Sequence, residues 1–470
     1  MEIGDLNFDS IFKKTKTFDD DFVDIFIESR VSNFLSNEGN KLERAVSGVS
    51  VGAGIRLINN KKSYYAYTNN INEKNISEIA GKLRQAAVSN KNNRLEDSRK
   101  LNFKELNPKI ELNILKTSVG FSIGEKIKKL NPAVKYAWNY DKRIIQVNVA
   151  YRDYKQDIFI VNSDGSFVKD CRENLILFVY VVASDGVKTE IGYEPAGGFI
   201  GFEFFDWNDP EKIAEKACKR AIMQLDAPFA PSGTMCVVLS SEAGGTMIHE
   251  AVGHGLEADI AGNGLSVYSD KIGSEIASKL ITVIDDPTLN GKRGSYRFDD
   301  EGTYSNKNVL VENGILKKYM CDKLSNIKYG YELTGNGRRE SYEHQPIVRM
   351  SNTMIAPGAT DPHDIIKSVN NGLFVRKMGG GQVNTVTGDF VFDVMEGYII
   401  KNGIVGEALS GATLMGNGPE VLKKIDMVGS DLGFGIGTCG KDGQHAPVAD
   451  AQPTLRIPSI VVGGKKELKN

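Results

Sequence analysis

The sequence predicts an α+β protein: an N-terminal α/β module with a β-meander, followed by a β-rich C-terminal domain that carries a distorted metal-binding helix. Three observations support this class: alternating apolar residues through the first half, helix-like stretches between them, and glycine-rich turns through the second half. A chain of 470 residues exceeds what one hydrophobic core usually supports. We therefore expect two domains, residues 1–228 and residues 229–470.

The N-terminal module begins with strands. Strand-like alternation occurs at 22–29, 44–58 and 63–68, and a helix-like pattern follows at 75–90. The next segment, near 90–109, is rich in asparagine and charged residues and has little apolar content. It predicts a linker and a possible boundary between two subdomains.

A second helix is predicted from about 111 to 130, and a β-meander follows it as far as Asp206. The residues Asn-Ser-Asp-Gly at 162–165 are typical of a turn between antiparallel strands. The apolar run at 175–183 is shorter than a membrane-spanning helix and indicates a buried strand. We therefore expect antiparallel hairpins in this part of the chain.

The first domain should end with a helix at 208–227. Asp209 is a suitable N-cap, and Pro210 fits the first helical position, where no backbone N–H is needed. The segment at 227–233 contains two prolines and marks the domain boundary. Beyond it, glycine-rich clusters predict long loops, where functional sites usually lie.

The segment MIHEAVGHGLEAD places two potential metal ligands, His249 and His254, beside the carboxylate of Glu250. Zinc peptidases often carry a similar motif in which the two histidines are four residues apart. Here the separation is five residues, which would turn the two imidazoles about 140° apart on a regular α-helix. The helix must therefore be distorted if both side chains hold one ion.

Glycines beside the second histidine indicate where that distortion lies. Gly253 and Gly255 flank His254, and glycine suits a helix end, a π-bulge or a tight turn. We predict a helix that begins near 242–245, runs through Glu250, and is distorted or ends around Gly253.

A catalytic zinc site usually has three protein ligands and one open position, so a third ligand must come from elsewhere. Cys439 is favoured because a thiolate binds zinc well and the neighbouring glycines permit close approach of the backbone. Four other residues are alternatives for this position: Glu257, Asp259, His344 and His445. The remaining cysteines lie in apolar patterns and are interpreted as core residues: Cys171, Cys218, Cys236 and Cys321.

The same residues also have a simpler interpretation. One histidine could lie on the surface of an ordinary helix and the other in its core, and a single buried cysteine usually behaves as a small apolar residue. The corresponding function is a non-catalytic peptide-binding or scaffold protein with a structural metal. Structural zinc sites are usually closed by four ligands, so three ligands and a nearby carboxylate favour an enzyme.

These residues and their surroundings resemble the TldD/PmbA family of peptidases, and within it the TldD branch, which carries an HExxxH motif that the PmbA (TldE) branch lacks. The resemblance is highly specific over residues 233–464 and looser over the N-terminal half. It rests on the following ordered blocks: HEAVGHGLEAD, RGSYRFDDEGT, VLVENGILKKYMCDKL, TGNGRRESYEH, MGGGQVNTVTGDFVF, GATLMGNG, GTCGKDGQHAPV and QPTLRI.

The resemblance implies a zinc-dependent metallopeptidase in which His249, His254 and Cys439 hold one Zn²⁺ per chain and Glu250 is the general base. Fe²⁺ is an alternative to Zn²⁺, because a thiolate ligand reduces the Lewis acidity of the metal. The implied substrates are short or unfolded peptides, including small precursor peptides that are matured or degraded. The implied assembly is a dimer, either with a paralogous metal-free PmbA/TldE-type subunit or with a second copy of this chain.

Composition argues against other classes of protein. The chain has 58 Lys and Arg against 60 Asp and Glu, a net charge of −2, so nothing draws it to nucleic acid. It has no apolar run long enough to span a membrane, and its first residues lack the order of a secretory signal. Five scattered cysteines fit a reducing compartment. We expect a cytoplasmic protein without nucleic-acid or membrane partners.

Two further motifs concern substrate recognition. Arg338 and Arg339 are candidates to bind a peptide carboxylate or carbonyl group, with a structural ion pair as the alternative. The glycines at 379–381 lack the Lys and the Ser or Thr of a phosphate-binding loop. We interpret them as a turn or as the wall of a groove.

Overall fold

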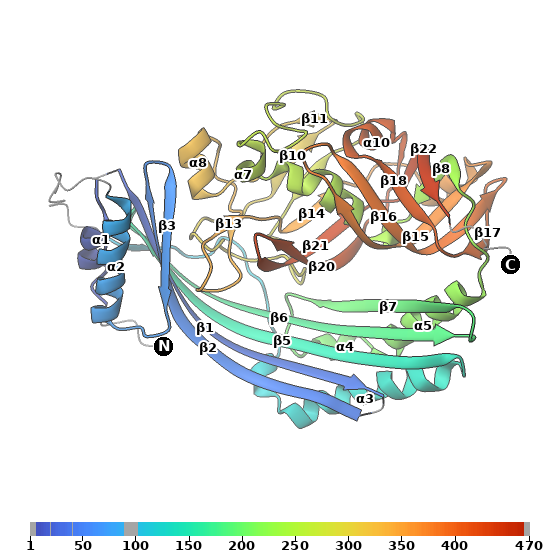
Figure 1. Ribbon diagram of the computed structural model, residues 1–470, viewed down its shortest axis with the longest axis horizontal. Helices are drawn as coiled ribbons and strands as arrows, with labels where there is room; N and C mark the ends of the chain where they lie inside the picture. Colours follow the sequence, from blue (N-terminus) through green and yellow to red (C-terminus); the bar gives the residue numbers. More distant parts are fainter. Residues whose placement is uncertain (1–5, 19, 40, 89–101, 465–470) are drawn as a thin grey trace.

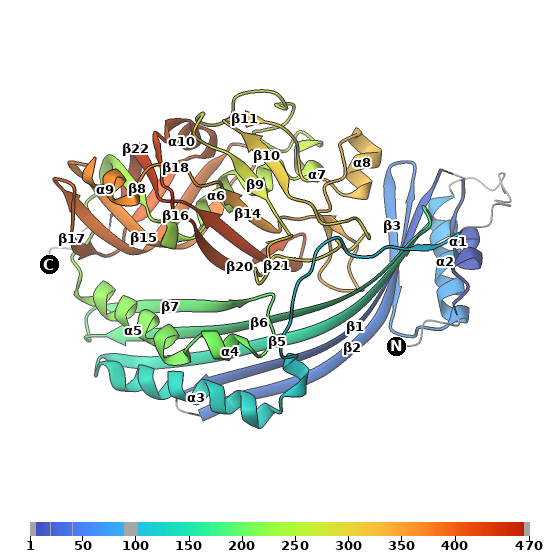
Figure 2. The ribbon, with the colours of Figure 1, turned by 180° about the vertical axis from the view of Figure 1, so that it is seen from behind.

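The computed structural model describes residues 6–464 except 19, 40 and 89–101, and it confirms the predicted mixture of helices and strands. A long, curved antiparallel sheet forms one layer, and the C-terminal half of the chain lies over one face of it (Figures 1 and 2). Helices cover the other face in two groups, α1 with α2 and α3 with α5. No helix in the described residues is long and apolar enough to cross a membrane.

The large sheet has the strand order β3-β2-β1-β5-β6-β4, and β7 also pairs with β6. Four of its strands are 17 to 19 residues long, which lets one sheet contact both groups of helices. The predicted turn at 162–165 joins β5 and β6 as an antiparallel hairpin. The strands are β1 (Phe22–Glu38), β2 (Lys41–Asn59), β3 (Lys62–Thr68), β4 (Lys104–Glu105), β5 (Ile144–Asn162), β6 (Ser166–Ser184) and β7 (Thr189–Gly198).

The helices of this half have the caps that their sequences suggest. Asp209 caps α5 by accepting a hydrogen bond from the N–H of Glu211, and Pro210 is the first helical residue, as predicted. The helix expected at 75–90 is α2, which begins after the N-cap Asn72. The helices are α1 (Phe8–Thr15), α2 (Glu73–Ala87), α3 (Ile123–Tyr140), α4 (Phe204–Trp207) and α5 (Pro210–Asp226).

Two predicted boundaries are wrong. The helix expected at 111–130 is α3, which begins only at Ile123 because Ser122 and Glu125 form a capping box there. The preceding segment is extended, since the N–H groups of Leu115 and Lys116 donate to the carboxylate of Glu203. The meander expected to reach Asp206 ends with β7 at Gly198. The predicted linker near 90–109 lies in part outside the described residues, and its described end contains β4.

The C-terminal half contains two further sheets and a short ribbon. One sheet has the order β11-β10-β9-β14-β21-β20, and the other has the order β15-β8-β22-β18-β16-β17 and closes on itself because β15 also pairs with β16. The main C-terminal core lies between these sheets and the helical segment that carries the histidine motif. The strands are β8 (Gly233–Leu239), β9 (Val283–Asp285), β10 (Asn308–Glu312), β11 (Ile315–Leu316), β12 (Gly337–Arg338), β13 (Ile347–Val348), β14 (Asn352–Ile355), β15 (Asn371–Val383), β16 (Asp389–Lys401), β17 (Ile404–Leu409), β18 (Thr413–Asn417), β19 (Met427–Val428), β20 (Gly433–Lys441), β21 (Gln444–Gln452) and β22 (Leu455–Gly463).

Helices in this half are short and lie between the strands. They are α6 (Thr246–Ile248), α7 (Ala258–Ala261), α8 (Lys323–Tyr329), α9 (Pro362–Lys367) and α10 (Gly418–Lys424). Only α6 and the turns that follow it carry the histidine motif.

The interpretation of four cysteines as core residues is correct for Cys218 and Cys321, which are buried, whereas Cys236 is partly exposed. It is wrong for Cys171, which is exposed. Cys171 lies on β6 opposite Asp157, between Phe167, which packs in the core formed with α1 and α2, and Leu175, which packs in the core formed with α3 and α5. Its neighbours in the sequence, Asp170 and Arg172, are charged, so Cys171 does not lie in an apolar strand pattern.

A buried ion network joins the large sheet to the C-terminal half. Arg56 on β2 donates to Asp24 on β1 and forms an ion pair of 2.7 Å with Glu301 from the other half. Arg339, also from the other half, contacts Asp24 at 3.2 Å. All four side chains are almost completely buried. Ion pairs at such depth contribute little net stability, but removal of one partner is costly because it leaves a buried charge unpaired.

We expect Arg56→Met to lower the free energy of unfolding by about 3–5 kcal/mol, because Glu301 would remain buried without its cation and Asp24 would keep only Arg339. Arg376→Met is the matched control, since its ion pair with Glu242 is exposed, and its stability should be close to that of the wild type. Chemical denaturation of the three proteins measures both values. Equal stability of the two variants would contradict the assigned role of Arg56.

Candidate metal centre

The histidine motif lies on a distorted helix, as predicted. After α6, residues 249–253 form one π-helical turn and residues 254–256 one 3₁₀ turn. The N–H of His254 donates to the carbonyl of His249, a hydrogen bond between residues five apart. This widened turn brings the two imidazoles to the same side of the helix, which a regular α-helix would not do.

The neighbouring glycines have a different role from the one expected. Gly253 has ordinary right-handed helical dihedral angles, φ −54° and ψ −57°, so the turn does not need its backbone freedom. A Cβ atom at Gly253 would lie 2.0 Å from Sδ of Met350, and one at Gly255 would lie 2.7 Å from the ring of Tyr268. The glycines therefore allow close packing around the helix.

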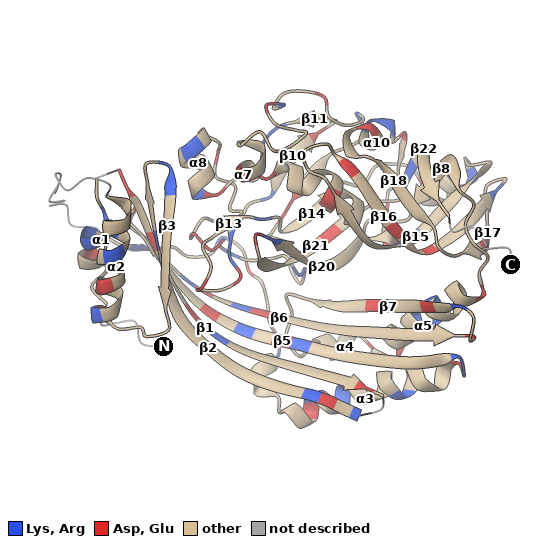
Figure 3. Ribbon diagram, in the orientation of Figure 1, with Lys and Arg blue, Asp and Glu red and all other residues tan. Residues whose placement is uncertain are grey.

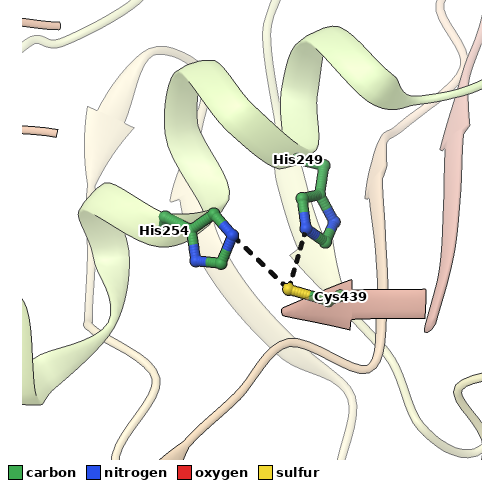
Figure 4. Close-up of side chains that lie close together, drawn as sticks. All are labelled: His249, His254 and Cys439. Atoms are coloured by element: carbon green, nitrogen blue, oxygen red, sulfur yellow. Dashed lines mark hydrogen bonds between the residues drawn. The ribbon is translucent and has the colours of Figure 1, made fainter. Parts of the chain in front are cut away.

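The third member of the site comes from the hairpin of β20 and β21. Asp442 and Gly443 form its turn, both with positive φ. Cys439 on β20 points at the two histidines, and its Sγ lies 3.2 Å from Nε2 of His249 and 3.4 Å from Nε2 of His254 (Figure 4). The potential ligand atoms of these three residues all lie within 4.8 Å of one another.

Carboxylates orient both imidazoles. Nδ1 of His249 lies 2.7 Å from Asp450 on β21, and Nδ1 of His254 lies 3.0 Å from Glu257. These contacts leave both Nε2 atoms directed at Cys439. Carboxylate partners of this kind fix the orientation of histidines that bind metals and increase their basicity.

The structure does not bring the alternative ligands into this cluster. Glu257 and Asp259 both bind the ammonium group of Lys441, at 3.0 and 2.7 Å. His344 contacts Ser341, and His445 is exposed on β21. Sequence reasoning missed Asp450 and Lys441.

Charges determine the protonation of the cluster. Burial lowers the pKa of His254, but the charge of Glu257 and the hydrogen bonds to Cys439 and Glu257 together outweigh burial and raise it to about 9. Burial likewise lowers the pKa of His249, and the charge of Asp450 raises it well above its usual value. Burial raises the pKa of Cys439, but hydrogen bonds from both histidines outweigh this effect and lower it to about 5. At neutral pH the metal-free cluster therefore contains a thiolate.

Glu250 follows the first histidine within the π-helical turn. Burial raises the pKa of its carboxyl group, and the charges of His249 and His254 partly offset this increase. Among the described residues its carboxylate has no hydrogen-bond or ion-pair partner. It is thus a titratable group beside the cluster that no other side chain holds.

The donor set fits a tetrahedral zinc ion. Bond lengths of about 2.3 Å to sulfur and 2.0–2.1 Å to nitrogen place tetrahedral N and S ligands about 3.5 Å apart. The observed separations are 3.2 and 3.4 Å. Two imidazoles and one thiolate also leave a fourth position open, as catalytic zinc sites require.

A cleft of about 410 Å³ lies beside the metal-binding residues. Asp450, part of β7 and residues 434–436 of β20 line it, together with residues 377–380 of β15. The glycine run at 379–381 is therefore part of strand β15 and not a turn. Gly379 and Gly380 line the cleft, which agrees with the other interpretation, the wall of a groove.

The two candidate arginines are held by structural contacts. Arg339 contacts Asp24 at 3.2 Å and also donates to the carbonyl of Asp300. Arg338 donates to the carbonyls of Met350 and Pro447. Arg339 therefore forms the structural ion pair that was the alternative to substrate binding. Among the described residues, the hydrogen bonds of Arg338 go to backbone carbonyls.

Comparison with known proteins gives a consistent result over the whole chain. Models described as the PmbA/TldA metallopeptidase domain 1, central domain and C-terminal domain match residues 23–87, 118–225 and 232–464.

Individual relatives match along almost their entire lengths. A metalloprotease TldD homologue of Buchnera aphidicola is 37% identical over 453 residues, which cover 94% of this chain and 93% of the relative. A zinc metalloprotease TldD homologue of Saccharolobus solfataricus is 28% identical over 456 residues, which cover 96% and 98%. The crystal structure of TldE from Thermococcus kodakarensis has a similar fold, with a TM-score of 0.74, 20% identity, and coverage of 96% of this chain and 98% of that one.

Zinc binding at about pH 7 should release about two protons per chain, because both histidines are protonated in the metal-free cluster whereas the thiolate already lacks its proton. Affinity should rise with pH to at least about 9, the pKa of His254, because protons on both imidazoles compete with the metal. Calorimetry in buffers of different ionisation enthalpy measures the released protons. If zinc binding releases no protons, the assignment of two protonated histidines and a thiolate to the metal-free cluster is wrong.

Proposed function

Because the chain belongs to the TldD/PmbA family of metallopeptidases, we propose that it is a zinc-dependent peptidase of the TldD branch that hydrolyses short or unfolded peptides, small precursor peptides among them. The observation that carries this proposal is the convergence of His249, His254 and Cys439, with an unengaged carboxylate beside them. The spacing of the donor atoms supports zinc over metals that prefer octahedral sites.

The two histidines and Cys439 would hold the ion, and Asp450 and Glu257 would keep the imidazoles in place. A bound zinc ion would supply Lewis acidity toward the peptide carbonyl and the attacking water. Glu250 would accept the proton of that water at its carboxylate and then give it to the leaving amine. Its raised pKa suits both transfers, since a base that is too acidic would not accept the proton near neutral pH.

The cleft beside the site supports an extended peptide as the substrate. Beyond Val375, β15 pairs with β16 alone among the described strands, so its other edge is free along the segment that lines the cleft. A free strand edge binds an extended chain through main-chain hydrogen bonds, with little demand on side-chain sequence.

A second free edge supports a dimer, with a paralogous metal-free subunit or a second copy of this chain. Residues 41–50 of β2 are exposed and, among the described strands, pair with β1 alone, because β3 pairs with residues 53–59. Val46 and Val49 on this edge are 57% and 69% exposed. Such an edge readily pairs with another chain.

We expect the mass of the protein in solution to be that of a dimer, either when the chain is measured by itself or when it is mixed with the paralogue. A monomeric mass under both conditions would contradict the dimer.

We expect Glu250→Gln to bind zinc as the wild type does and to lose peptide cleavage by a factor of about 10²–10⁴, since the amide cannot accept a proton. Zinc content and turnover of an unfolded peptide mixture measure the two effects. Glu242→Gln is the matched control, because Glu242 is exposed and paired with Arg376. Unchanged cleavage by Glu250→Gln would favour a metal that is only structural, as in a scaffold protein.

A further inference from the structure

A second, larger cavity lies on the other side of the β20–β21 hairpin from the metal-binding residues. Its volume is about 600 Å³, and it lies between this hairpin and the face of β1, β5 and β6 opposite α3 and α5. Thr438 and its cross-strand partner Pro447 line it. The side chain of Cys439, the next residue, points the opposite way to the histidines. The cavity is therefore distinct from the metal centre.

The cavity is lined by arginines, and we call it the arginine cavity. Figure 3 shows basic residues on β1, β5 and β6 in the part of the sheet under β20 and β21. Two of the arginines are neutralised, Arg172 by Asp300 at 2.7 Å and Arg339 by Asp24 at 3.2 Å. The other four form no ion pair with a carboxylate of the described residues: Arg30, Arg152, Arg293 and Arg338.

The carboxylates that line the cavity do not balance these charges, although Glu28, which lies outside the lining, interacts with the charge of Arg30. Only three carboxylates line the cavity against six arginines, and each is already engaged. Asp153 binds Lys126 at 2.6 Å, Asp300 binds Arg172, and Glu340 accepts a hydrogen bond of 2.6 Å from the N–H of His445. The cavity therefore has a positive field that walls of low dielectric concentrate.

Two of the uncompensated arginines are deeply buried. Arg293 and Arg338 are only 8% and 6% exposed. Arg293 donates to a carbonyl, an amide oxygen and the hydroxyl of Thr438, and Arg338 donates to carbonyls alone. A buried guanidinium without an anion is unfavourable, and the burial of Arg293 lowers its pKa accordingly. An anion that enters the cavity would relieve this cost.

The other two arginines are positioned to receive a ligand. The guanidinium of Arg30 lies over the ring of Tyr154 at 4.0 Å, and that of Arg152 lies over the ring of Phe34 at 4.8 Å. Stacking on a ring fixes the plane of the guanidinium and leaves its N–H edge available. A planar guanidinium binds a carboxylate through two parallel hydrogen bonds.

The arginine cavity lies next to the cleft beside the metal centre, because Arg293 lines both. We propose that this cavity binds carboxylate groups of the peptide whose scissile bond lies in that cleft, so that the protein prefers acidic peptides. This rests on the proposed peptidase function for the identity of the ligand. The carboxylate can belong to an Asp or Glu side chain or to the C-terminus of the peptide.

The test measures binding, so that it does not depend on cleavage. The Glu250→Gln protein, loaded with zinc, is titrated into fluorescent unstructured peptides that differ only in Glu or Gln at several positions, each with a free or an amidated C-terminus. If the carboxylate comes from a side chain, we expect the Glu peptides to bind at least about tenfold more tightly than the Gln peptides. If the C-terminus is the source, amidation should cause that loss instead.

The cavity itself is tested with Arg30→Gln combined with Arg152→Gln. These side chains stack on rings, and in the described part of the chain they form no hydrogen bond or ion pair with the β20–β21 hairpin, so zinc content should be unchanged. The double variant should lose the preference for carboxylates and keep its affinity for the uncharged, amidated peptide. Arg84→Gln on α2 is the matched control, because Arg84 does not line the cavity, and it should behave as the wild type.

Three results would overturn this proposal. Equal affinity for all four peptides would exclude a carboxylate site, and a preference that survives in the double variant would place it elsewhere. If inorganic phosphate binds to the protein and acidic peptides are not preferred, the cavity is a phosphate site. None of these results depends on whether Glu250→Gln abolishes cleavage, so failure of the peptidase proposal remains separately visible.

Discussion

A single hydrogen bond, from the N–H of His254 to the carbonyl of His249, sets the geometry of the whole site. It widens the helix by one residue, so that two imidazoles five residues apart meet the same sulfur atom. In a regular α-helix the two imidazoles would point about 140° apart, and they could not bind the same metal ion. The tight packing of Gly253 on Met350 holds this turn within the core.

The position of Cys439 depends on buried arginines. Arg293, Arg338 and Arg349 each donate to backbone carbonyls of the β20–β21 hairpin, and the partner of Arg349 is the carbonyl of Cys439 itself. The segment that supplies these arginines is clamped to the large sheet through Arg56 and Glu301. The long sheet thus supports the metal centre indirectly, and the arginine cavity lies between the two.

Sequence patterns predicted the fold class and a distorted helix between the two histidines, because periodicity and a five-residue spacing are local properties. The distortion was expected around Gly253 but already begins at His249. The patterns misplaced the start of α3, since the extended segment before it is held by Glu203, which is distant in sequence. They also missed Asp450, although a signal for it was present. The Asp-Gly turn at 442–443 fixes the register of the hairpin, in which Cys439 pairs with Ala446. Asp450 is four residues beyond Ala446 on the same strand and therefore lies on the same face of the hairpin. The lining of the arginine cavity comes from strands far apart in the chain, and no local pattern indicates it.

The most direct test of this account is the zinc-to-protein ratio of the purified wild type beside Cys439→Ser and His254→Ala, with cleavage of an unfolded peptide mixture assayed on the same samples. The account predicts about one zinc per chain in the wild type and the loss of both zinc and cleavage in each variant. Zinc that survives both substitutions, or cleavage without zinc, would show that the two histidines and Cys439 do not form the active centre.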